Sequence, residues 1–263
     1  MADDLTSAIF IGDGERDPLR SVQNQQRRVL PKRFYKAASI GAEAPFAALL
    51  DGKSVRTPAG CALALPSERA AALVAAEWNA QGETIDPSTM PVTRLANSAL
   101  DGVARDIGAV AADMVKYLGS DLVCYRAGEP EALAAAQAAT WNPVLDFARS
   151  AFGARFILAE GVMFVEQPVH AVAAAARAVE AHANADDAAF RIAALHSMTT
   201  LTGSALIALA HVGGLLSLEQ AWDAAHVDED FQMRLWGLDS EALARRTRRF
   251  EDMKAASELF AAL

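Results

Sequence analysis

The amino-acid sequence predicts an α+β protein: a small antiparallel β-rich N-terminal domain followed by a larger helical-bundle C-terminal domain. Turn residues typical of hairpins are concentrated before Pro66. Beyond that point apolar residues recur mainly at helical spacing, and alanine runs such as residues 173–176 favour closely packed helices. We therefore expect an N-terminal arm over 1–32, a β-rich domain with connecting helices over 33–126, and a helical domain over 127–263.

The β-rich domain is expected to begin at Arg33, because the preceding residues show no sustained period and are interrupted by glycine and proline. Asp51-Gly52 separates two short apolar runs, and this pair favours a tight hairpin turn in which both central residues have positive φ. Pro58-Ala59-Gly60 provides a second turn. The pattern predicts a meander with strands within residues 34–40, 46–50, 53–57 and 61–65.

Two helices are expected to join this meander to the helical domain. Ser67 can cap a helix that runs to about Gln81 and ends at Gly82. A second long helix begins near Thr93, where apolar residues recur at helical spacing. Residues 110–118 continue as helix, and residues 122–125 have the composition of one more short strand.

The remainder of the chain reads as helix, with one ambiguous segment. Residues 155–166 contain two short apolar runs around Glu160-Gly161, which suggests a hairpin, although runs this short fit strand or helix. The most hydrophobic stretch, residues 201–216, is too short and too interrupted to span a bilayer and is interpreted as a buried core helix. Four consecutive helices with short joints suggest a bundle, at about 168–183, 186–212, 217–236 and 239–262.

Charge and cysteine content restrict the classes of function. A formal net charge of -9 repels phosphate backbones and anionic lipid, so we expect neither nucleic-acid binding nor membrane insertion. Basic stretches at Arg27-Arg28 with Lys32-Arg33 and at residues 245–249 are interpreted as solvated positive faces. Two cysteines without a metal-like spacing, and a polar N-terminus without a secretory signal, favour a cytoplasmic protein.

Motifs for catalysis are absent from the sequence. Neither phosphate-binding glycine pattern occurs, and no G-x-S-x-G elbow is present. His226, Glu229 and Asp230 have the spacing to share one helical face, and metal binding there is the alternative that we consider least favoured. We expect no metal and no other cofactor.

Two stretches of this chain form a distinctive pair: Ala76-Glu77-Trp78-Asn79-Ala80-Gln81-Gly82 and the segment from Met90-Pro91-Val92 to Leu100-Asp101. Together they closely resemble the signature of the ATP synthase F(1) assembly chaperones that act on the alpha subunit. Upstream, Arg33-Phe34-Tyr35-Lys36 and Leu50-Asp51-Gly52-Lys53 resemble the opening strands of the family, and downstream Asp228-Glu229-Asp230-Phe231-Gln232 with Trp236-Gly237 resembles its C-terminal motif.

The resemblance implies a binding protein without enzymatic activity or a required cofactor. Its implied partner is the newly made alpha subunit, whose apolar surface it would shield until that subunit pairs with beta. A bacterial cytoplasmic member is expected, or a mitochondrial matrix protein if the source is eukaryotic. A metal-dependent or small-molecule enzyme near His226 and a helical scaffold with another client remain the alternatives.

Two groups of residues are expected to matter most. Arg94, Asn97 and Asp101 should lie on successive turns of one helix near Trp78 and have a structural role. The client surface is expected on the C-terminal helices, since adjacent acids repel one another unless a neighbouring or partner cation offsets them. Its residues are Asp228, Glu229, Asp230 and Trp236. We expect the free protein to be a monomer.

Overall fold

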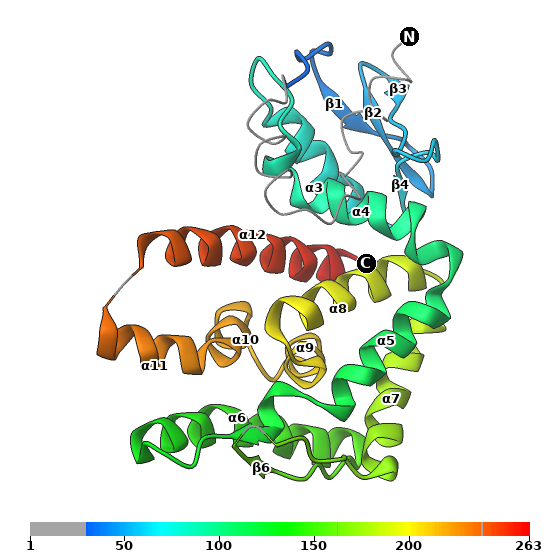
Figure 1. The fold of residues 1–263 in the computed structure, drawn as a ribbon. Coiled ribbons are helices and arrows are strands. Elements are labelled where there is room, and N and C mark those ends of the chain that lie inside the picture. Colours follow the sequence, from blue (N-terminus) through cyan, green and yellow to red (C-terminus); the bar gives the residue numbers. More distant parts are fainter. Residues whose placement is uncertain (1–29, 162, 238) are drawn as a thin grey trace. The chain divides into compact units, whose positions relative to one another are not determined.

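The computed structural model describes residues 30–161, 163–237 and 239–263, which form two compact units (Figure 1). The first, here the β-rich unit, ends at Arg105 and includes Ala262–Leu263, and the second, the helical unit, comprises Asp106–Ala261. The division therefore comes earlier than the boundary after residue 126 that the sequence suggested. Helix α5 (Ile107–Gly119) packs against α7 (Val169–Ala183), α8 (Ala188–Thr202) and α9 (Ala205–Val212), which places it in the helical unit.

The β-rich unit contains a sheet built around β2 (Phe46–Leu50). This strand pairs antiparallel with β1 (Ala38–Ile40), β3 (Lys53–Ser54) and β4 (Ala64–Leu65). The hairpin between β2 and β3 is the one that Asp51-Gly52 predicts, because φ is 47° at Asp51 and 80° at Gly52. Local turn chemistry thus fixes the register of the β2–β3 hairpin.

The expected N-terminal arm is only partly visible, because residues 1–29, including Arg27 and Arg28, lie outside the described residues. Its last residues are joined to the β-rich unit. The carbonyl of Pro31 accepts a hydrogen bond from Ile85 N at 2.8 Å, and Lys32 forms an antiparallel bridge with Thr84.

Two helices complete the β-rich unit, together with the short 3-10 turns η1 (Pro87–Thr89) and η2 (Val103–Arg105). Helix α3 (Glu68–Asn79) packs against β1 and β2, and its N-terminus is capped as expected, since Ser67 Oγ accepts from Ala70 N at 3.0 Å. Helix α4 (Pro91–Asp101) begins two residues before Thr93, with a proline at its first position.

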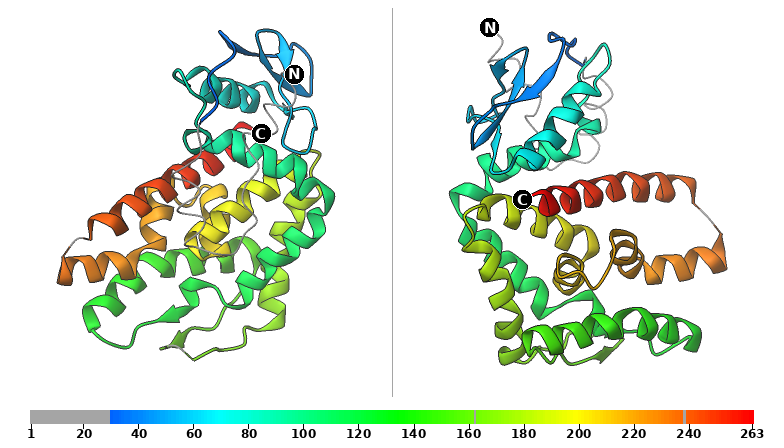
Figure 2. Two further views of the ribbon diagram at one scale, coloured as in Figure 1. Left: turned by 45° about the horizontal axis from the view of Figure 1, so that its top comes forward. Right: turned by 180° about the vertical axis from the view of Figure 1, so that it is seen from behind.

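The helical unit contains two short paired strands and most of the helices (Figure 2). Besides α5, α7, α8 and α9, its elements are η3 (Leu122–Cys124), β5 (Tyr125–Arg126), α6 (Glu131–Phe152), β6 (Ala159–Glu160), α10 (Leu218–Ala225), α11 (Val227–Trp236) and α12 (Ser240–Ala262). Its core lies around α8 and α9, and residues 205–210 of α9 are all buried, as expected for the hydrophobic stretch. No helix of the described residues is long and apolar enough to cross a bilayer.

Two of the expected long helices are each interrupted. The helix expected over 186–212 breaks at Gly203, where φ is +68°, and restarts as α9 with Ser204 as its cap. The helix expected over 217–236 breaks at His226, whose φ of -123° is not helical. Apolar periodicity continues across both breaks, so it could not reveal them.

The hairpin suggested for residues 155–166 is wrong. Strand β6 pairs parallel with β5, through the partners Tyr125–Ala159 and Arg126–Glu160, rather than with the residues that follow it. In the first apolar run, both backbone groups of Ile157 are instead hydrogen-bonded to the Gln167 side-chain amide, each at 2.8 Å.

Candidate functional site

Trp78 lies in the core of the β-rich unit, and its contacts explain why a large aromatic residue occupies this position. Its side chain is fully buried, and the Tyr35 ring meets it edge-on at a centroid distance of 5.6 Å. The Tyr35 hydroxyl also donates to the Trp78 carbonyl at 2.6 Å. The pair therefore joins the segment that precedes β1 to the last turn of α3.

Glu77, the neighbour of Trp78, acts as a cap for another helix. Its carboxylate accepts hydrogen bonds from Val92 N and Thr93 N, both at 2.7 Å, and from Thr93 Oγ1 at 2.6 Å. These are free amides of the first turn of α4, whose own N-cap residue, Met90, has no side-chain acceptor. Burial raises the pKa of Glu77, and the hydrogen bonds from Thr93 and Val92 oppose that rise.

Arg33 binds the C-terminal end of α3. Its guanidinium donates to the carbonyls of Tyr35 at 3.2 Å, Lys36 at 2.8 Å, Asn79 at 3.3 Å and Gln81 at 2.5 Å. A cation at the C-terminal carbonyls of a helix is favoured by the helix dipole. Arg33 and Glu77 were missed as individual residues, because only the folded chain shows which backbone groups they reach.

Arg94, Asn97 and Asp101 lie on α4, as predicted. Asp101 accepts from Thr57 Oγ1 at 2.6 Å and from Ala59 N at 3.0 Å, which joins the end of α4 to the turn before β4. Asn97 is buried, whereas Arg94 is exposed and places its charge near Glu77. Their structural role remains a prediction, and these contacts support it.

The acidic residues of the expected client surface form the first turn of α11. Asp228 Oδ1 accepts from Gln137 Nε2 of α6 at 2.7 Å, and Asp230 is paired with both terminal nitrogens of the Arg246 guanidinium of α12. Glu229 makes no hydrogen bond or ion pair with the described residues. Part of the repulsion expected among these acids is therefore offset within the protein, and by the positive end of the α11 dipole.

Trp236 lies at the other end of α11 and is exposed over 84% of its surface, which makes it the most exposed of the large apolar side chains described. The neighbouring Leu235 is 62% exposed. The helix ends at Gly237, where φ is 91°. A side chain this exposed contributes little buried apolar area to the stability of the fold, and exposed tryptophans are typical anchors of protein interfaces.

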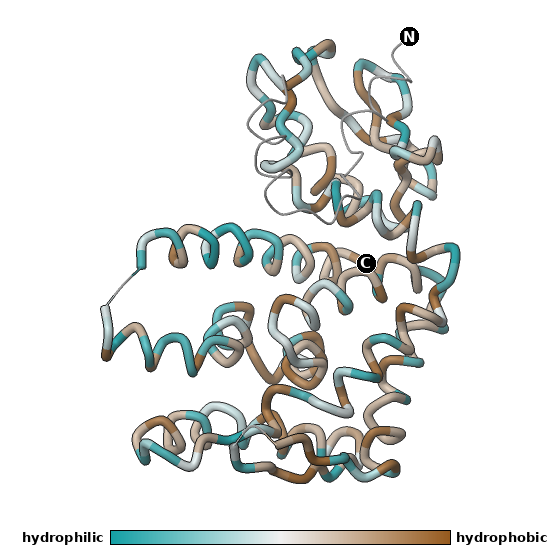
Figure 3. The backbone as a smooth tube through the Cα atoms, viewed as in Figure 1, coloured by the Kyte–Doolittle hydropathy of each residue, from teal (hydrophilic) through white to brown (hydrophobic). Residues whose placement is uncertain are grey.

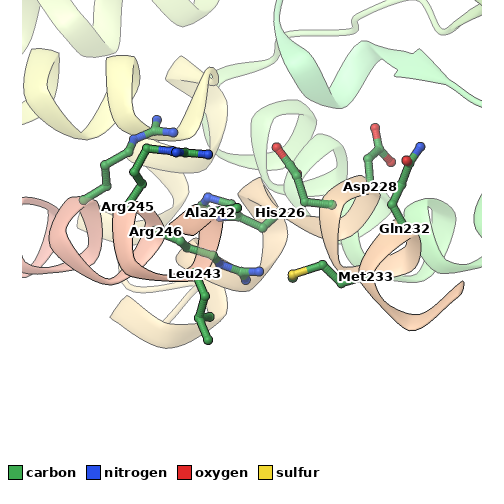
Figure 4. A pocket seen from close by; sticks show the side chains of 10 residues that line it. His226, Asp228, Gln232, Met233, Ala242, Leu243, Arg245 and Arg246 are labelled. Carbon is green, nitrogen blue, oxygen red and sulfur yellow. The ribbon is translucent and has the colours of Figure 1, made fainter. Parts of the chain in front are cut away.

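A cavity of about 600 Å³ lies between α11 and α12. Figure 4 shows arginine side chains of α12 on one side of it, and Asp228, Gln232 and Met233 of α11 on the other. The cavity is thus bounded by one cationic and one acidic wall, with apolar groups between them. Its lining residues are His226, Asp228, Glu229, Gln232, Met233, Ala242, Leu243, Arg245, Arg246 and Arg249.

His226 is held as a structural residue at the start of α11. It is buried, its Nδ1 lies 2.7 Å from the Trp222 carbonyl, and burial lowers its pKa. Nδ1 is thus committed to that carbonyl and Asp230 is paired with Arg246, so two of the three candidate metal ligands have other partners. In the part of the chain that the structure describes, no group of three histidine, cysteine or acidic side chains is arranged to hold a metal ion.

Comparison with known proteins decides the family. Residues 32–149 match the family described as ATP12 chaperone protein. The crystal structure of a candidate chaperone from Agrobacterium tumefaciens is 48% identical in sequence and has a TM-score of 0.86, over 98% of this chain and 96% of that one. The chain belongs to the ATP12 chaperone family.

Other solved ATP12 structures extend this result. Atp12 from Paracoccus denitrificans is 37% identical with a TM-score of 0.80, over 88% of this chain and 98% of that one. An aspartate-to-lysine mutant of the same Paracoccus protein matches equally well, over 97% of its length. The α+β fold class and the family resemblance inferred from the motifs are both confirmed.

Proposed function

We propose that this ATP12 protein assists assembly of the F(1) sector of ATP synthase by binding the unassembled alpha subunit. It shields the apolar surface of that subunit until the subunit pairs with beta. The observation that carries the proposal is membership of a chaperone family, shown by the match of residues 32–149 and by the similarity to solved ATP12 structures over 88% of this chain. Shielding of this surface would by itself protect the alpha subunit, because exposed apolar patches drive aggregation of incomplete assemblies.

In this proposal the client contacts the outer end of α11 and the cavity beside it. Trp236 and Leu235 offer apolar area that is mostly exposed to solvent. Glu229 offers a carboxylate that makes no hydrogen bond or ion pair with the described residues, at the acidic wall of the cavity. An aromatic anchor gives affinity, and a charged rim gives orientation and a faster encounter.

The proposed activity is binding without a catalytic step and without a cofactor. An enzyme centred on His226 is the less favoured candidate, because the ring is hydrogen-bonded to the Trp222 carbonyl and two of the three neighbouring acids, Asp228 and Asp230, have partners of their own. We further propose that the protein is a monomer when free and that it acts in the bacterial cytoplasm, or in the mitochondrial matrix if the source is eukaryotic.

Charge reversal at Glu229 tests the α11 surface. We expect Glu229→Lys to weaken capture of the alpha subunit about five- to tenfold at low salt, with a smaller effect at high salt, because rim charges act over roughly a Debye length. The measurement is binding of isolated alpha subunit at several salt concentrations. Asp228→Lys is less informative, since it also removes the hydrogen bond to Gln137.

Glu180→Lys on α7 is the matched control, because it makes the same change at an exposed site that does not line the cavity. It should leave capture within about twofold of the unmodified protein, a range typical of changes outside an interface. Equal affinity and equal salt dependence for the Glu229→Lys and Glu180→Lys proteins would show that the α11 surface is not the contact.

A further inference from the structure

In the segment that connects α6 to the start of α7, large apolar side chains are exposed to solvent and a polar side chain is buried. Met163 is 75% exposed, Phe164 68% and Val169 78%, and Ile157 and Leu158 are also exposed. These five are half of the ten exposed large apolar side chains among the described residues. In contrast, the polar Gln167 of the same segment is buried. Figure 3 shows the apolar colouring in this part of the helical unit, near β6.

Hydrogen bonds to the backbone of this segment hold the apolar side chains in their exposed positions. The side-chain oxygen of Gln167 accepts from Ile157 N and its nitrogen donates to Ile157 O, both at 2.8 Å. Strand β6 is fixed to β5, and Gly161 N donates to the Arg126 carbonyl at 2.9 Å. A buried amide that saturates both backbone groups of one residue fixes the path of the segment. The apolar side chains are therefore exposed by the way the segment is built.

The surroundings of the apolar residues are acidic. Glu160 and Glu166 are exposed within the segment, and Glu129 and Glu131 are exposed beside it, where the Glu160 side chain packs over Gly128. The segment itself has one exposed cation, Arg155. Such a rim is repelled by anionic lipid and attracts a surface that carries basic side chains.

We propose that this segment, residues 155–161 and 163–169, is a second docking surface for the client, separate from the α11 surface. The surface that it takes is an apolar patch of a protein with lysine or arginine at its edge. Methionine and phenylalanine adapt to irregular apolar surfaces, which suits a partner that is bound before its own assembly is complete. This inference rests on the proposed function, since it requires a client with exposed apolar surface.

The test is capture of the isolated alpha subunit by the double variant Met163→Ser with Phe164→Ser. We expect capture to weaken about tenfold or more, as for the loss of interface anchors, and suppression of alpha-subunit aggregation to weaken in parallel. Leu215→Ser is the control, because it removes an exposed leucine outside the segment, and it should change capture by less than about twofold. Thermal unfolding of both variants is measured alongside, and a normal transition is expected since the replaced side chains are exposed.

The outcomes separate this inference from the proposed function. If the unmodified protein captures the alpha subunit and the double variant does so equally well, the second surface is wrong and the proposed function stands. If the unmodified protein does not capture the alpha subunit at all, both fail. Loss of self-association in sedimentation, or loss of binding to vesicles with anionic lipid, without a change in capture would assign the segment to a second copy or to a membrane and overturn the inference.

Discussion

Trp78→Ala is expected to lower the free energy of unfolding by about 3–5 kcal/mol, the range for removal of a large aromatic side chain from a core. The indole is fully buried in the β-rich unit, and its loss leaves a void and removes the edge contact with Tyr35. Since whole proteins are stable by only about 5–15 kcal/mol, much of the variant should be unfolded near physiological temperature. Urea unfolding followed by circular dichroism measures the change.

Trp236→Ala is the matched control, because it makes the same substitution at a side chain that is 84% exposed. It should leave the unfolding midpoint almost unchanged and weaken client capture instead. If both variants were destabilised equally, Trp236 would have to be packed against the protein in solution, and its role as a client anchor would be wrong.

Asp121 is expected to give the second large effect. This carboxylate is fully buried, and it accepts hydrogen bonds from Ser204 Oγ at 2.5 Å, Leu206 N at 3.0 Å and Val123 N at 3.3 Å. It thereby connects η3 to the N-terminus of α9, the most buried helix of the unit. Asp121→Ala leaves these donors without an acceptor, and we expect a loss of about 3 kcal/mol or more in unfolding free energy.

Asp121 is also expected to make the free energy of unfolding depend on pH. Burial raises the pKa of Asp121 from 3.8 to about 6, so the folded state binds its proton more tightly than the unfolded state. The stability that comes with protonation is fully present below about pH 3.8 and is lost as the pH rises through about 6. The loss amounts to about 3 kcal/mol, at 1.36 kcal/mol for each pKa unit.

Asp121→Asn cannot ionise and is the variant that isolates this effect. It should be less stable than the unmodified protein at acidic pH, because one backbone N–H loses its acceptor, and the gap should narrow or reverse toward pH 7. Unfolding free energies from pH 4 to 7 provide the comparison. Parallel curves for the two proteins would show that Asp121 does not titrate in this range.

Features that depend on neighbouring residues were predictable from the sequence. The turn at Asp51-Gly52 was predicted because its two backbone conformations are a local property of those residues. The same is true of the Ser67 cap and of the helical periodicity beyond Pro66. The residues of α4 were placed on one helix for the same reason.

Features that depend on distant backbone groups were not predictable. The pairing of β5 with β6 joins residues more than thirty positions apart, and no local signal specifies it. Arg33, Glu77 and Asp121 each bind backbone groups of another element, so their role follows from the fold and not from spacing.

The candidate site was predictable only in part. Asp228, Glu229, Asp230 and Trp236 were placed on one C-terminal helix, where the structure has them. The basic stretch over residues 245–249 was interpreted as a solvated face, but Arg246 in fact forms the ion pair with Asp230. The cavity arises because α12 returns along α11, an arrangement that charge patterns alone do not define.

The most direct test of the proposed function is a comparison of client capture with separately prepared alpha and beta subunits of F(1). We expect the protein to bind the isolated alpha subunit and keep it soluble, and not to bind beta. It should release alpha when beta is added, because the shielded surface of alpha is the one that beta covers. Equal binding to both subunits, or retention of alpha in the presence of beta, would contradict the account.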